Sequence, residues 1–309
     1  MCINKNFDTL QFLLISAIKE KFYDGLLLGG FDSSIILALN PKVVALTVSL
    51  ENYAEDVYYV NLFIKEFKFK YVHYKVDIEE ALGAIPDVIK IIKSFDPAIP
   101  NDLAIYFGMK KAKEIGLTSV ATGDGSDELF AGYSFMQKLD DLNSYISKII
   151  KVMKFSSNTI AKFFGLKIIQ PFTYKALVDF SLGLQANMKI HKAGGKIWGK
   201  WILRKAFQDI LPDKVIWQSK RPIEVGSGMR HLREIITAKI SDEEFKEKKL
   251  LYPVKFLNKE HLYYYEIYRK VVGNIPIPKQ KEKICPGCGS GLKIDVFWCR
   301  VCGYVLNFL

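Results

Sequence analysis

The chain has 309 residues, half of them hydrophobic, which is enough for a sizeable buried core and favours two or three domains over one compact unit. It contains no low-complexity tract and no repeat of fixed period, so the composition excludes a solenoid or a disordered array. Lysine plus arginine exceed aspartate plus glutamate by 44 − 33 = 11. This balance favours polyanionic ligands such as nucleotides, pyrophosphate or RNA, although a generally basic proteome would explain it equally well.

The sequence predicts a cytoplasmic protein without a membrane partner. Its longest apolar runs, such as residues 10–18, are shorter than the roughly 18 residues that a spanning helix needs, and charged residues flank them. The N-terminus also lacks the basic region, hydrophobic segment and small-residue cleavage site of a secretory signal.

The first part of the chain alternates between strand-like and helix-like segments. An amphipathic helix is expected over residues 8–20, with Asp8 as its N-cap. Strands are expected at residues 23–30, 43–49, 70–77 and 119–124, with helices between them, including 33–39 and 54–67. This alternation predicts a parallel sheet covered on both faces, with ligands bound beyond the carboxyl ends of its strands.

The pattern divides the chain into four parts. Residues 1–138 form the predicted α/β domain, and residues 139–275, mostly helical with breaks at proline and glycine, form a helical subdomain packed on the sheet. Residues 276–283 contain two prolines and three lysines and are expected to be a linker. Residues 284–309 form a small cysteine-containing unit.

The motif LLLGGFDSS places two glycines, an acid and two hydroxyls directly after an apolar strand. Gly29 and Gly30 allow a sharp turn that brings backbone N–H groups and the next helix N-terminus to one point, an arrangement that binds phosphate. Ser33 and Ser34 add hydroxyl donors. Asp32 would repel phosphate unless a cation intervened, so it is predicted to bind magnesium. An ordinary strand-to-helix turn explains this motif alone almost as well, and it matches neither a Walker loop nor a dinucleotide fingerprint.

A second motif, TGDGSDELFAGY, follows the strand at 119–124. Asp124, Asp127 and Glu128 crowd one turn around Gly123 and Gly125. Like charges this close are costly unless a metal or a cationic substrate group relieves them. The helix macrodipole explains one or two of these acids at a helix start, but not the glycines as well.

Both motifs resemble the synthetase domain of the asparagine synthetase and beta-lactam synthetase family, within the PP-loop ATP pyrophosphatase group. GGFDSS is similar to the pyrophosphate loop and GDGSDELFAGY to the second acidic signature. The resemblance continues through SFDPAIPND, QPFTYKALVDFSLGL, KIWGKWILRKAF and LPDKVIWQSKRPIEVGSG, and covers roughly residues 20–230. It implies a PP-loop sheet of the adenine nucleotide alpha hydrolase type, with a helical subdomain that completes the synthetase site.

The resemblance implies that ATP adenylates a carboxylate, such as that of aspartate, with release of pyrophosphate, and that ammonia or an amine then displaces AMP. Asp32 and Asp127 would hold magnesium, and Lys220 would stabilise the leaving pyrophosphate. Asp124 would deprotonate the amine or position the substrate ammonium, with Glu128 supporting the site. The implied nucleotide-binding residues are Leu28, Gly29, Gly30, Asp32, Ser33, Ser34, Thr47, Gly123, Gly226, Ser227 and Gly228, with Ser49 as a weaker adenosine contact.

Two features depart from the family pattern. Leu28 replaces the serine that usually opens the PP-loop, and losing one such hydrogen bond costs on the order of 1 to 3 kcal/mol. Only about twenty residues precede the first strand, which leaves no room for a glutaminase domain. Cys2 is therefore interpreted as coincidental. The amine would be free ammonia, a substrate amine, or ammonia from a separate glutaminase subunit.

Four cysteines near the C-terminus have the spacing of a metal site. Cys285, Cys288, Cys299 and Cys302 form CPGC, ten intervening residues and CRVC, with a glycine after each pair. Two such knuckles supply the tetrahedral thiolates that zinc needs. The cytoplasmic prediction disfavours disulfides, while a four-thiolate iron centre stays open. Zinc ribbons often contact RNA, DNA or protein, so RNA is a candidate partner.

The leading prediction is an ATP-dependent, AMP-forming amide synthetase that binds ATP, Mg²⁺ and Zn²⁺. A second candidate adenylates a tRNA base and uses the ribbon to bind RNA, but a sulfur-transfer version would need spare cysteines, and only Cys2 lies outside the ribbon. A third is a nucleotide-binding or RNA-binding scaffold in which Leu28 marks a decayed site. The retained acids and Lys220 argue against decay.

Overall fold

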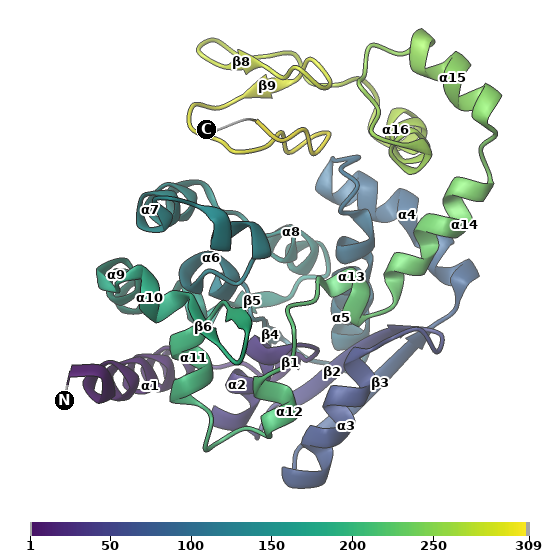
Figure 1. The fold of residues 1–309 in the computed structure, drawn as a ribbon. Helices are drawn as coiled ribbons and strands as arrows, with labels where there is room; N and C mark the ends of the chain where they lie inside the picture. The colour runs from purple at the N-terminus through teal and green to yellow at the C-terminus, as the bar shows by residue number, and fades with distance from the viewer. Residues whose placement is uncertain (1, 307–309) are drawn as a thin grey trace.

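A five-stranded parallel sheet with the order β3-β2-β1-β4-β5 forms the centre of the protein (Figure 1). Its strands are β1 (Gly25–Leu27), β2 (Val44–Leu50), β3 (Lys70–Val76), β4 (Ser119–Ala121) and β5 (Lys167–Ile169). The computed structural model describes residues 2–306, and the side chains from residue 5 onward. The side chain of Cys2 and the last three residues of the predicted ribbon lie outside this part. The predicted parallel α/β fold is confirmed.

Helices surround the sheet. They are α1 (Cys2–Glu20), α2 (Phe31–Leu39), α3 (Asp56–Glu66), α4 (Ile78–Ile92), α5 (Ile99–Glu114), α6 (Ser126–Phe130), α7 (Leu142–Val152), α8 (Ser156–Phe163), α9 (Lys175–Gly183), α10 (Ala186–Lys189), α11 (Trp201–Ala206), α12 (Asp213–Ile216), α13 (Ile223–Gly226), α14 (Leu232–Ala238), α15 (Asp242–Leu251) and α16 (Lys259–Val271). Short 3₁₀ turns lie at η1 (Ser134–Lys138), η2 (Pro171–Thr173) and η3 (Met229–His231).

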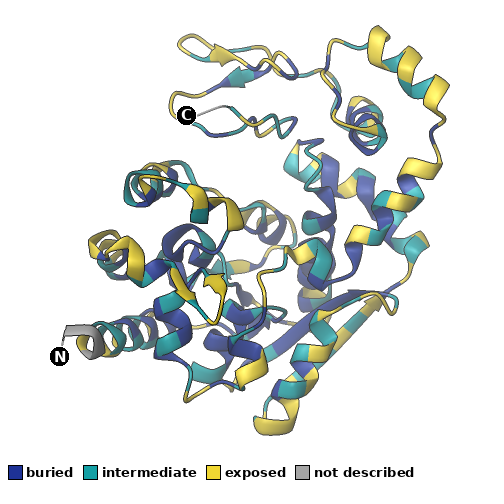
Figure 2. Ribbon diagram, in the orientation of Figure 1, coloured by how far each residue is buried: buried dark blue, intermediate teal, exposed yellow. Residues whose placement is uncertain are grey.

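The sheet separates two hydrophobic cores. Along β2, Leu46, Val48 and Leu50 pack with α4 and α5 on one face, whereas Ala45 belongs to the core formed with α1, α2 and α11. Successive side chains of a strand point to opposite faces, so an almost wholly apolar strand can serve both cores. Figure 2 shows the buried sheet and the exposed outer surfaces of α3 and α15.

The structure differs from the expected elements at three places. One is the antiparallel hairpin of β6 (His191–Ala193) and β7 (Lys196–Trp198), within the region predicted to be mostly helical. The first helix begins at Cys2 rather than at residue 8. A fifth strand, β5, lies within the region predicted to be helical, and Ile168 pairs with Val120 of β4. This strand has three residues, none of them fully buried, and is too short for a period-two pattern to be recognised. The four-part domain division stays a prediction.

The C-terminal segment packs against the α/β part. Its hairpin is β8 (Lys283–Ile284) paired with β9 (Gly291–Leu292), and the second cysteine loop follows. The Phe95 N–H donates a hydrogen bond of 2.8 Å to the Val301 carbonyl, and Ser94 Oγ donates one of 3.2 Å to the same oxygen. Within residues 2–306, no helix combines the length and apolarity needed to cross a bilayer.

Candidate active site

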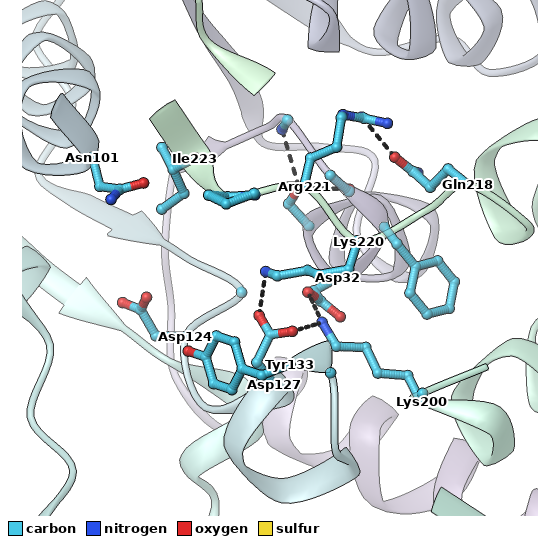
Figure 3. Close-up of a pocket in the computed structure, with 18 of the residues that line it drawn as sticks. Asp32, Asn101, Asp124, Asp127, Tyr133, Lys200, Gln218, Lys220, Arg221 and Ile223 are labelled. Carbon is cyan, nitrogen blue, oxygen red and sulfur yellow. Dashed lines mark hydrogen bonds and ion pairs between the residues drawn. The ribbon is translucent and has the colours of Figure 1, made fainter. Parts of the chain in front are cut away.

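A cavity of about 980 Å³ opens where β1 and β4 end (Figure 3). Both motifs line it, together with parts of β2 and α5, the segments 133–137, 196–200 and 218–223, and Ser227. The carboxyl ends of neighbouring parallel strands meet at the same edge of a sheet, so the two motifs come together although about ninety residues separate them.

The glycine turn connects β1 to α2. A Cβ on Gly29 would lie 2.5 Å from Asp56 Oδ2 and would displace that carboxylate, whereas a Cβ on Gly30 would meet no atom within 4 Å. Ser33 Oγ accepts a hydrogen bond of 3.1 Å from the Gly29 N–H, and Ser33 and Ser34 each donate one of 3.0 Å to the Gly30 carbonyl. The turn is thus held by its own hydroxyls and leaves open space beside Gly30.

Two carboxylates, one from each motif, converge on a single ammonium group. Lys200 Nζ lies 2.5 Å from Asp32 Oδ2 and 2.7 Å from Asp127 Oδ1. Lys220 Nζ lies 2.6 Å from the other oxygen, Asp127 Oδ2. Ser126 donates a hydrogen bond of 2.7 Å to Asp32 Oδ1. The four charged groups form one cluster, which Figure 3 shows at the centre of the cavity.

The charges of this cluster reinforce one another. Burial alone would raise the pKa of Asp127, but the ammonium groups of Lys200 and Lys220 outweigh it and hold that pKa at about 2. Burial alone would lower the pKa of Lys220, but the Asp127 and Asp32 carboxylates raise it. Asp127 and Lys220 therefore remain charged at neutral pH.

Lys200 is the main site residue that sequence reasoning missed. It follows the hairpin of β6 (His191–Ala193) and β7 (Lys196–Trp198) and precedes α11, with the left-handed backbone angles φ 56° and ψ 31°. Its N–H donates a hydrogen bond of 2.9 Å to the Phe130 carbonyl, at the end of the second motif. A non-glycine residue in this conformation stores backbone strain, typical of positions that the surrounding structure fixes. The quoted segment KIWGKWILRKAF contains Lys200, but nothing local distinguishes it from neighbouring lysines.

Asp124 lies apart from this cluster. Its Oδ2 accepts hydrogen bonds from Thr122 Oγ1 at 2.7 Å, Ser157 Oγ at 2.5 Å and Gln170 Nε2 at 2.8 Å. In Figure 3 it lies on the opposite side of the cavity from Lys200. Three donors on one oxygen fix the orientation of this carboxylate at the cavity wall.

Glu128 is the third acid of the second motif. Burial raises its pKa, although Glu128 accepts a hydrogen bond of 2.7 Å from the Tyr133 hydroxyl. Burial and the nearby carboxylates also raise the pKa of Tyr133 well above its ordinary value. Tyr133 is one of the residues that line the cavity, and its hydrogen bond to Glu128 fixes its position there.

A second buried ion pair lies beside the glycine turn. Arg221 Nη2 donates hydrogen bonds of 3.0 Å to Asp56 Oδ1 and 2.8 Å to Gln218 Oε1, and its guanidinium lies 4.1 Å from the centre of the Tyr59 ring. Burial raises the pKa of Asp56, and Arg221 opposes that effect. Sequence reasoning missed both charges. Arg221 lies next to Lys220, which was predicted, whereas nothing in the sequence around Asp56 indicates a role in the site.

Most of the predicted site residues line the cavity, and some do not. Lining residues are Leu28, Gly29, Gly30, Asp32, Ser33, Gly123, Asp124, Asp127, Glu128, Lys220 and Ser227. Ser34, Thr47, Ser49, Gly226 and Gly228 are not among them.

The β2 residues that were expected to contact adenosine do not line the cavity, and their role stays a prediction. Thr47 is buried, and its hydroxyl donates a hydrogen bond of 2.8 Å to the Leu28 carbonyl. Ser49 Oγ lies 2.7 Å from His73 Nε2 of the neighbouring strand. Leu46 and Val48, which alternate with these residues, line the cavity instead. The strand therefore offers an apolar surface to a ligand, because a shift of one residue exchanges the two faces.

The residues present fit a magnesium ion. Asp127 Oδ1 is buried and, apart from its ion pair with Lys200, receives no hydrogen bond. The two carboxylates, from different loops, converge on the Lys200 ammonium, and hard oxygen donors of this kind also suit Mg²⁺ bound together with substrate phosphates. Asp32 and Asp127 are the residues that would hold it.

The four C-terminal cysteines also come together. Their sulfurs lie within 4.8 Å of one another and all four residues are buried. Cys285 Sγ lies 3.7 Å from Cys302 Sγ, and Cys288 Sγ lies 3.8 Å from Cys299 Sγ. Tetrahedral zinc with Zn–S bonds of about 2.3 Å separates its sulfurs by about 3.8 Å. The sulfurs are too far apart for disulfides and fit one tetrahedral ion.

Comparison with known proteins places this site in a family. The asparagine synthase family model matches residues 25–162 and 151–262. The chain is 26% identical over 290 residues to a probable glutamine-hydrolysing asparagine synthetase of Dictyostelium discoideum, covering 78% of this chain and 52% of that protein. It is 27% identical over 306 residues to asparagine synthetase B of Escherichia coli (strain K12), covering 88% and 54%.

The chain spans about half the length of these curated relatives. A U34-tRNA thiolase from Methanococcus maripaludis with its 4Fe-4S cluster matches 98% of this chain and 89% of its own, at 14% identity and a TM-score of 0.35, a likeness too low to inform the function. The match of residues 25–262, which include both motifs and both site lysines, shows that the chain belongs to the asparagine synthase family.

Proposed function

We propose that this protein is an ATP-dependent amide synthetase, which converts ATP to AMP and pyrophosphate while it activates a small carboxylate for attack by ammonia or an amine. The observation that carries the proposal is the convergence of Asp32 and Asp127 on Lys200, with Lys220 beside Asp127, in one cavity at the edge of the sheet. In such a cluster the carboxylates can hold a magnesium ion at the triphosphate, and the ammonium groups can stabilise the negative charge of the departing pyrophosphate.

The chain offers distinct surfaces to each part of ATP. The open space beside Gly30 and the N-terminus of α2 suit the phosphates. Leu46 and Val48 offer an apolar surface to the adenine. Magnesium, when bound by Asp32 and Asp127, supplies positive charge at the phosphates.

The reaction has two steps. A carboxylate oxygen of the substrate attacks the α-phosphorus of ATP, the bond to the bridging oxygen of the β-phosphate breaks, and an acyl adenylate and pyrophosphate form. Lys200 and Lys220 stabilise the charge of the departing pyrophosphate. The amine nitrogen then attacks the acyl carbon, AMP leaves, and a proton passes from the nitrogen to a base. We assign that base, or the site that positions the ammonium, to Asp124, which Ser157 and Gln170 hold at the cavity wall.

Other parts of the assignment rest on the family. As the nitrogen donor we propose free ammonium, a substrate amine, or ammonia from a separate glutaminase subunit. We further propose a cytoplasmic protein whose cysteine unit binds Zn²⁺, with RNA as a candidate contact of that unit.

The test is magnesium-dependent release of AMP and pyrophosphate from ATP, measured with ammonium chloride and a panel of carboxylic acids. We expect Asp127→Asn and Lys220→Ala to abolish it. Lys175→Ala is the matched control, because Lys175 also pairs with an aspartate at 2.6 Å, but on the exposed surface. The absence of carboxylate-dependent pyrophosphate release from a protein that binds ATP would overturn the proposal.

A further inference from the structure

The cysteine unit, residues 284–306 (yellow in Figure 1), contacts two separate parts of the protein. One is the connection between α4 and α5, where the Phe95 N–H donates a hydrogen bond of 2.8 Å to the Val301 carbonyl. The other is α7, because Arg300 Nη2 donates a hydrogen bond of 2.6 Å to the Val152 carbonyl. Two neighbouring residues of one cysteine loop thus bind both parts at once.

The contact with Val152 lies at the C-terminal end of α7. Carbonyl groups in the last turn of a helix lack intrahelical donors, and a guanidinium there also interacts favourably with the helix dipole. The next residues, 153–157, lead into α8. Ser157 lines the cavity and donates a hydrogen bond of 2.5 Å to Asp124 Oδ2. Arg300 therefore holds the point from which the chain reaches Asp124.

A second connection runs through four aromatic rings. Phe297, which is buried, makes an edge contact with Tyr145 of α7, with 5.0 Å between the ring centroids. Tyr145 in turn makes an edge contact of 5.7 Å with Phe135, and Phe135 stacks on Tyr133 at 5.7 Å. Phe135 and Tyr133 line the cavity. Aromatic pairs in these arrangements attract one another beyond the effect of their burial.

Tyr133 connects this series of rings to the charged groups of the site. Its hydroxyl donates a hydrogen bond of 2.7 Å to Glu128, and Lys220 Nζ lies 5.6 Å from the centre of its ring. An ammonium at that distance is attracted to the face of a tyrosine ring. A shift of Tyr133 would therefore disturb the surroundings of Lys220, which was assigned above to the departing pyrophosphate.

The part of the chain that receives these contacts has a small core of its own. Ala131, Met136 of η1, and Leu142 and Ile146 of α7 form a buried cluster separate from the two cores beside the sheet. Hydrophobic stabilisation grows with the apolar area removed from water, so four side chains hold η1 and α7 less firmly than the large cores hold the sheet. Contacts from the cysteine unit therefore matter for the position of η1 and α7.

We propose that the cysteine unit positions one wall of the cavity and, on the basis of the function proposed above, is thereby a working part of the synthetase. Arg300 holds the end of α7 that leads to Ser157 and Asp124, and Phe297 supports the rings that end at Tyr133. The glycine turn, by contrast, is held by its own hydroxyls. Loss of either contact should loosen the wall that carries Asp124 and leave ATP binding at the glycine turn nearly unchanged.

The test compares Phe297→Ala and Arg300→Ala with the unaltered full-length chain. Lys293→Ala is the matched control, because Lys293 is an exposed cation of the same unit and belongs to neither connection. Arg300 is exposed, so its variant is expected to fold. An unchanged metal content per chain verifies that the cysteine unit itself stays intact in Phe297→Ala.

The first readout is amide hydrogen exchange in the protein without ligands. We expect exchange at residues 133–139 to become at least about threefold faster in Phe297→Ala, and exchange at 153–157 to become so in Arg300→Ala. Exchange at residues 28–34, in the glycine turn and the start of α2, should change less than about twofold. Lys293→Ala should change none of these segments.

The second readout is the kinetics of carboxylate-dependent pyrophosphate release and amide formation. We expect kcat for amide formation to fall at least about tenfold in Phe297→Ala and Arg300→Ala, because a misplaced wall misplaces the groups that act on the amine, while KM for ATP changes less than about twofold. Tyr145→Ala should resemble Phe297→Ala, and the double variant should add little, since the two rings act in series. Tyr145→Phe, which keeps the ring, should behave like the unaltered protein.

Each outcome decides the inference. Unchanged exchange at 133–139 and 153–157 would overturn it, and so would equally faster exchange at 28–34, which would show general destabilisation. Additive effects of Phe297→Ala and Tyr145→Ala, or altered exchange with unchanged kinetics in an active protein, would overturn it as well. If the unaltered protein binds ATP but releases no pyrophosphate with any carboxylate, the proposed function fails, and the exchange result alone decides whether the cysteine unit positions the wall.

Discussion

Replacing Lys200 with methionine removes the ammonium that Asp32 and Asp127 share, while most of the apolar side chain is kept. The Lys200 side chain is 4% exposed, and its Nζ lies 2.5 Å from Asp32 and 2.7 Å from Asp127. Removing one partner of a buried ion pair costs about 3 to 5 kcal/mol when the other charge loses all compensation. The lower end, about 3 kcal/mol, applies here, because Asp127 keeps Lys220 and Asp32 keeps its hydrogen bond from Ser126. We expect Lys200→Met to lower the free energy of unfolding by this amount at pH 7.

The matched comparison is Lys220→Met. The Lys220 side chain is 33% exposed, and its partner Asp127 keeps Lys200, so the expected loss is about 1 kcal/mol or less. Both variants should lose pyrophosphate release, whereas only Lys200→Met should lose much stability. Urea unfolding followed by the fluorescence of the four tryptophans measures the difference, provided that the m-value is unchanged.

The destabilisation caused by Lys200→Met should also depend on pH in a direction that can be predicted. The pKa of Asp127 is lowered to about 2, so its stabilising contribution is present above about pH 4 and is lost as the pH falls towards 2. The cost of Lys200→Met should therefore be largest at neutral pH and shrink below about pH 4. Adding Asp32→Asn should recover part of the loss, because the two residues interact directly. Equal destabilisation by the two lysine variants, or a cost independent of pH, would refute the reasoning.

Three further predictions follow from the buried acids and the cysteines. Burial raises the pKa of Asp102 to about 7, so its stabilising contribution is lost as the pH rises from about 4 through 7. Asp102→Asn should therefore raise the free energy of unfolding, measured in urea, by a few kcal/mol at pH 8 and by little at pH 4. Asp124→Asn should retain carboxylate-dependent exchange of pyrophosphate into ATP but slow amide formation about a hundredfold or more, and equal loss of both would contradict its role. Metal analysis should find one zinc per chain, and its removal by a chelator should increase amide hydrogen exchange at Phe95, whose N–H binds the Val301 carbonyl; unchanged exchange would contradict that coupling.

The main features of the fold and the meeting of the two motifs could be predicted from the sequence. The strands around Leu26 and Val120 are short apolar runs that end in polar turn residues, and neighbouring parallel strands bring their carboxyl ends to one edge. Asp32 and Asp127 therefore had to lie near each other once both strands were placed in one sheet. Which cation they share was expected to be magnesium, and a lysine ammonium lies between them in this structure.

The remaining differences have local physical causes. Lys200 reaches the cluster through a left-handed backbone position and a hydrogen bond to Phe130, both of which depend on tertiary structure. The sequence does not reveal which face of β2 lines the cavity, because a strand buried on both faces gives no alternation from which to read its orientation. The strand at Ile168 is only three residues long, and pairing with β4, not local pattern, determines it.

The packing of the cysteine loop against Phe95 bears on how the chain can be shortened. The family match ends at residue 262, yet the hydrophobic core that contains Phe95 also includes Tyr268 and Cys299. Cutting the chain at the proline-rich segment 276–283 would uncover that core beside α5, whose residues line the cavity. The segment from residue 276 to 306 therefore shares a hydrophobic core with the α/β part of the protein, and a truncated version should lose solubility although it keeps both motifs.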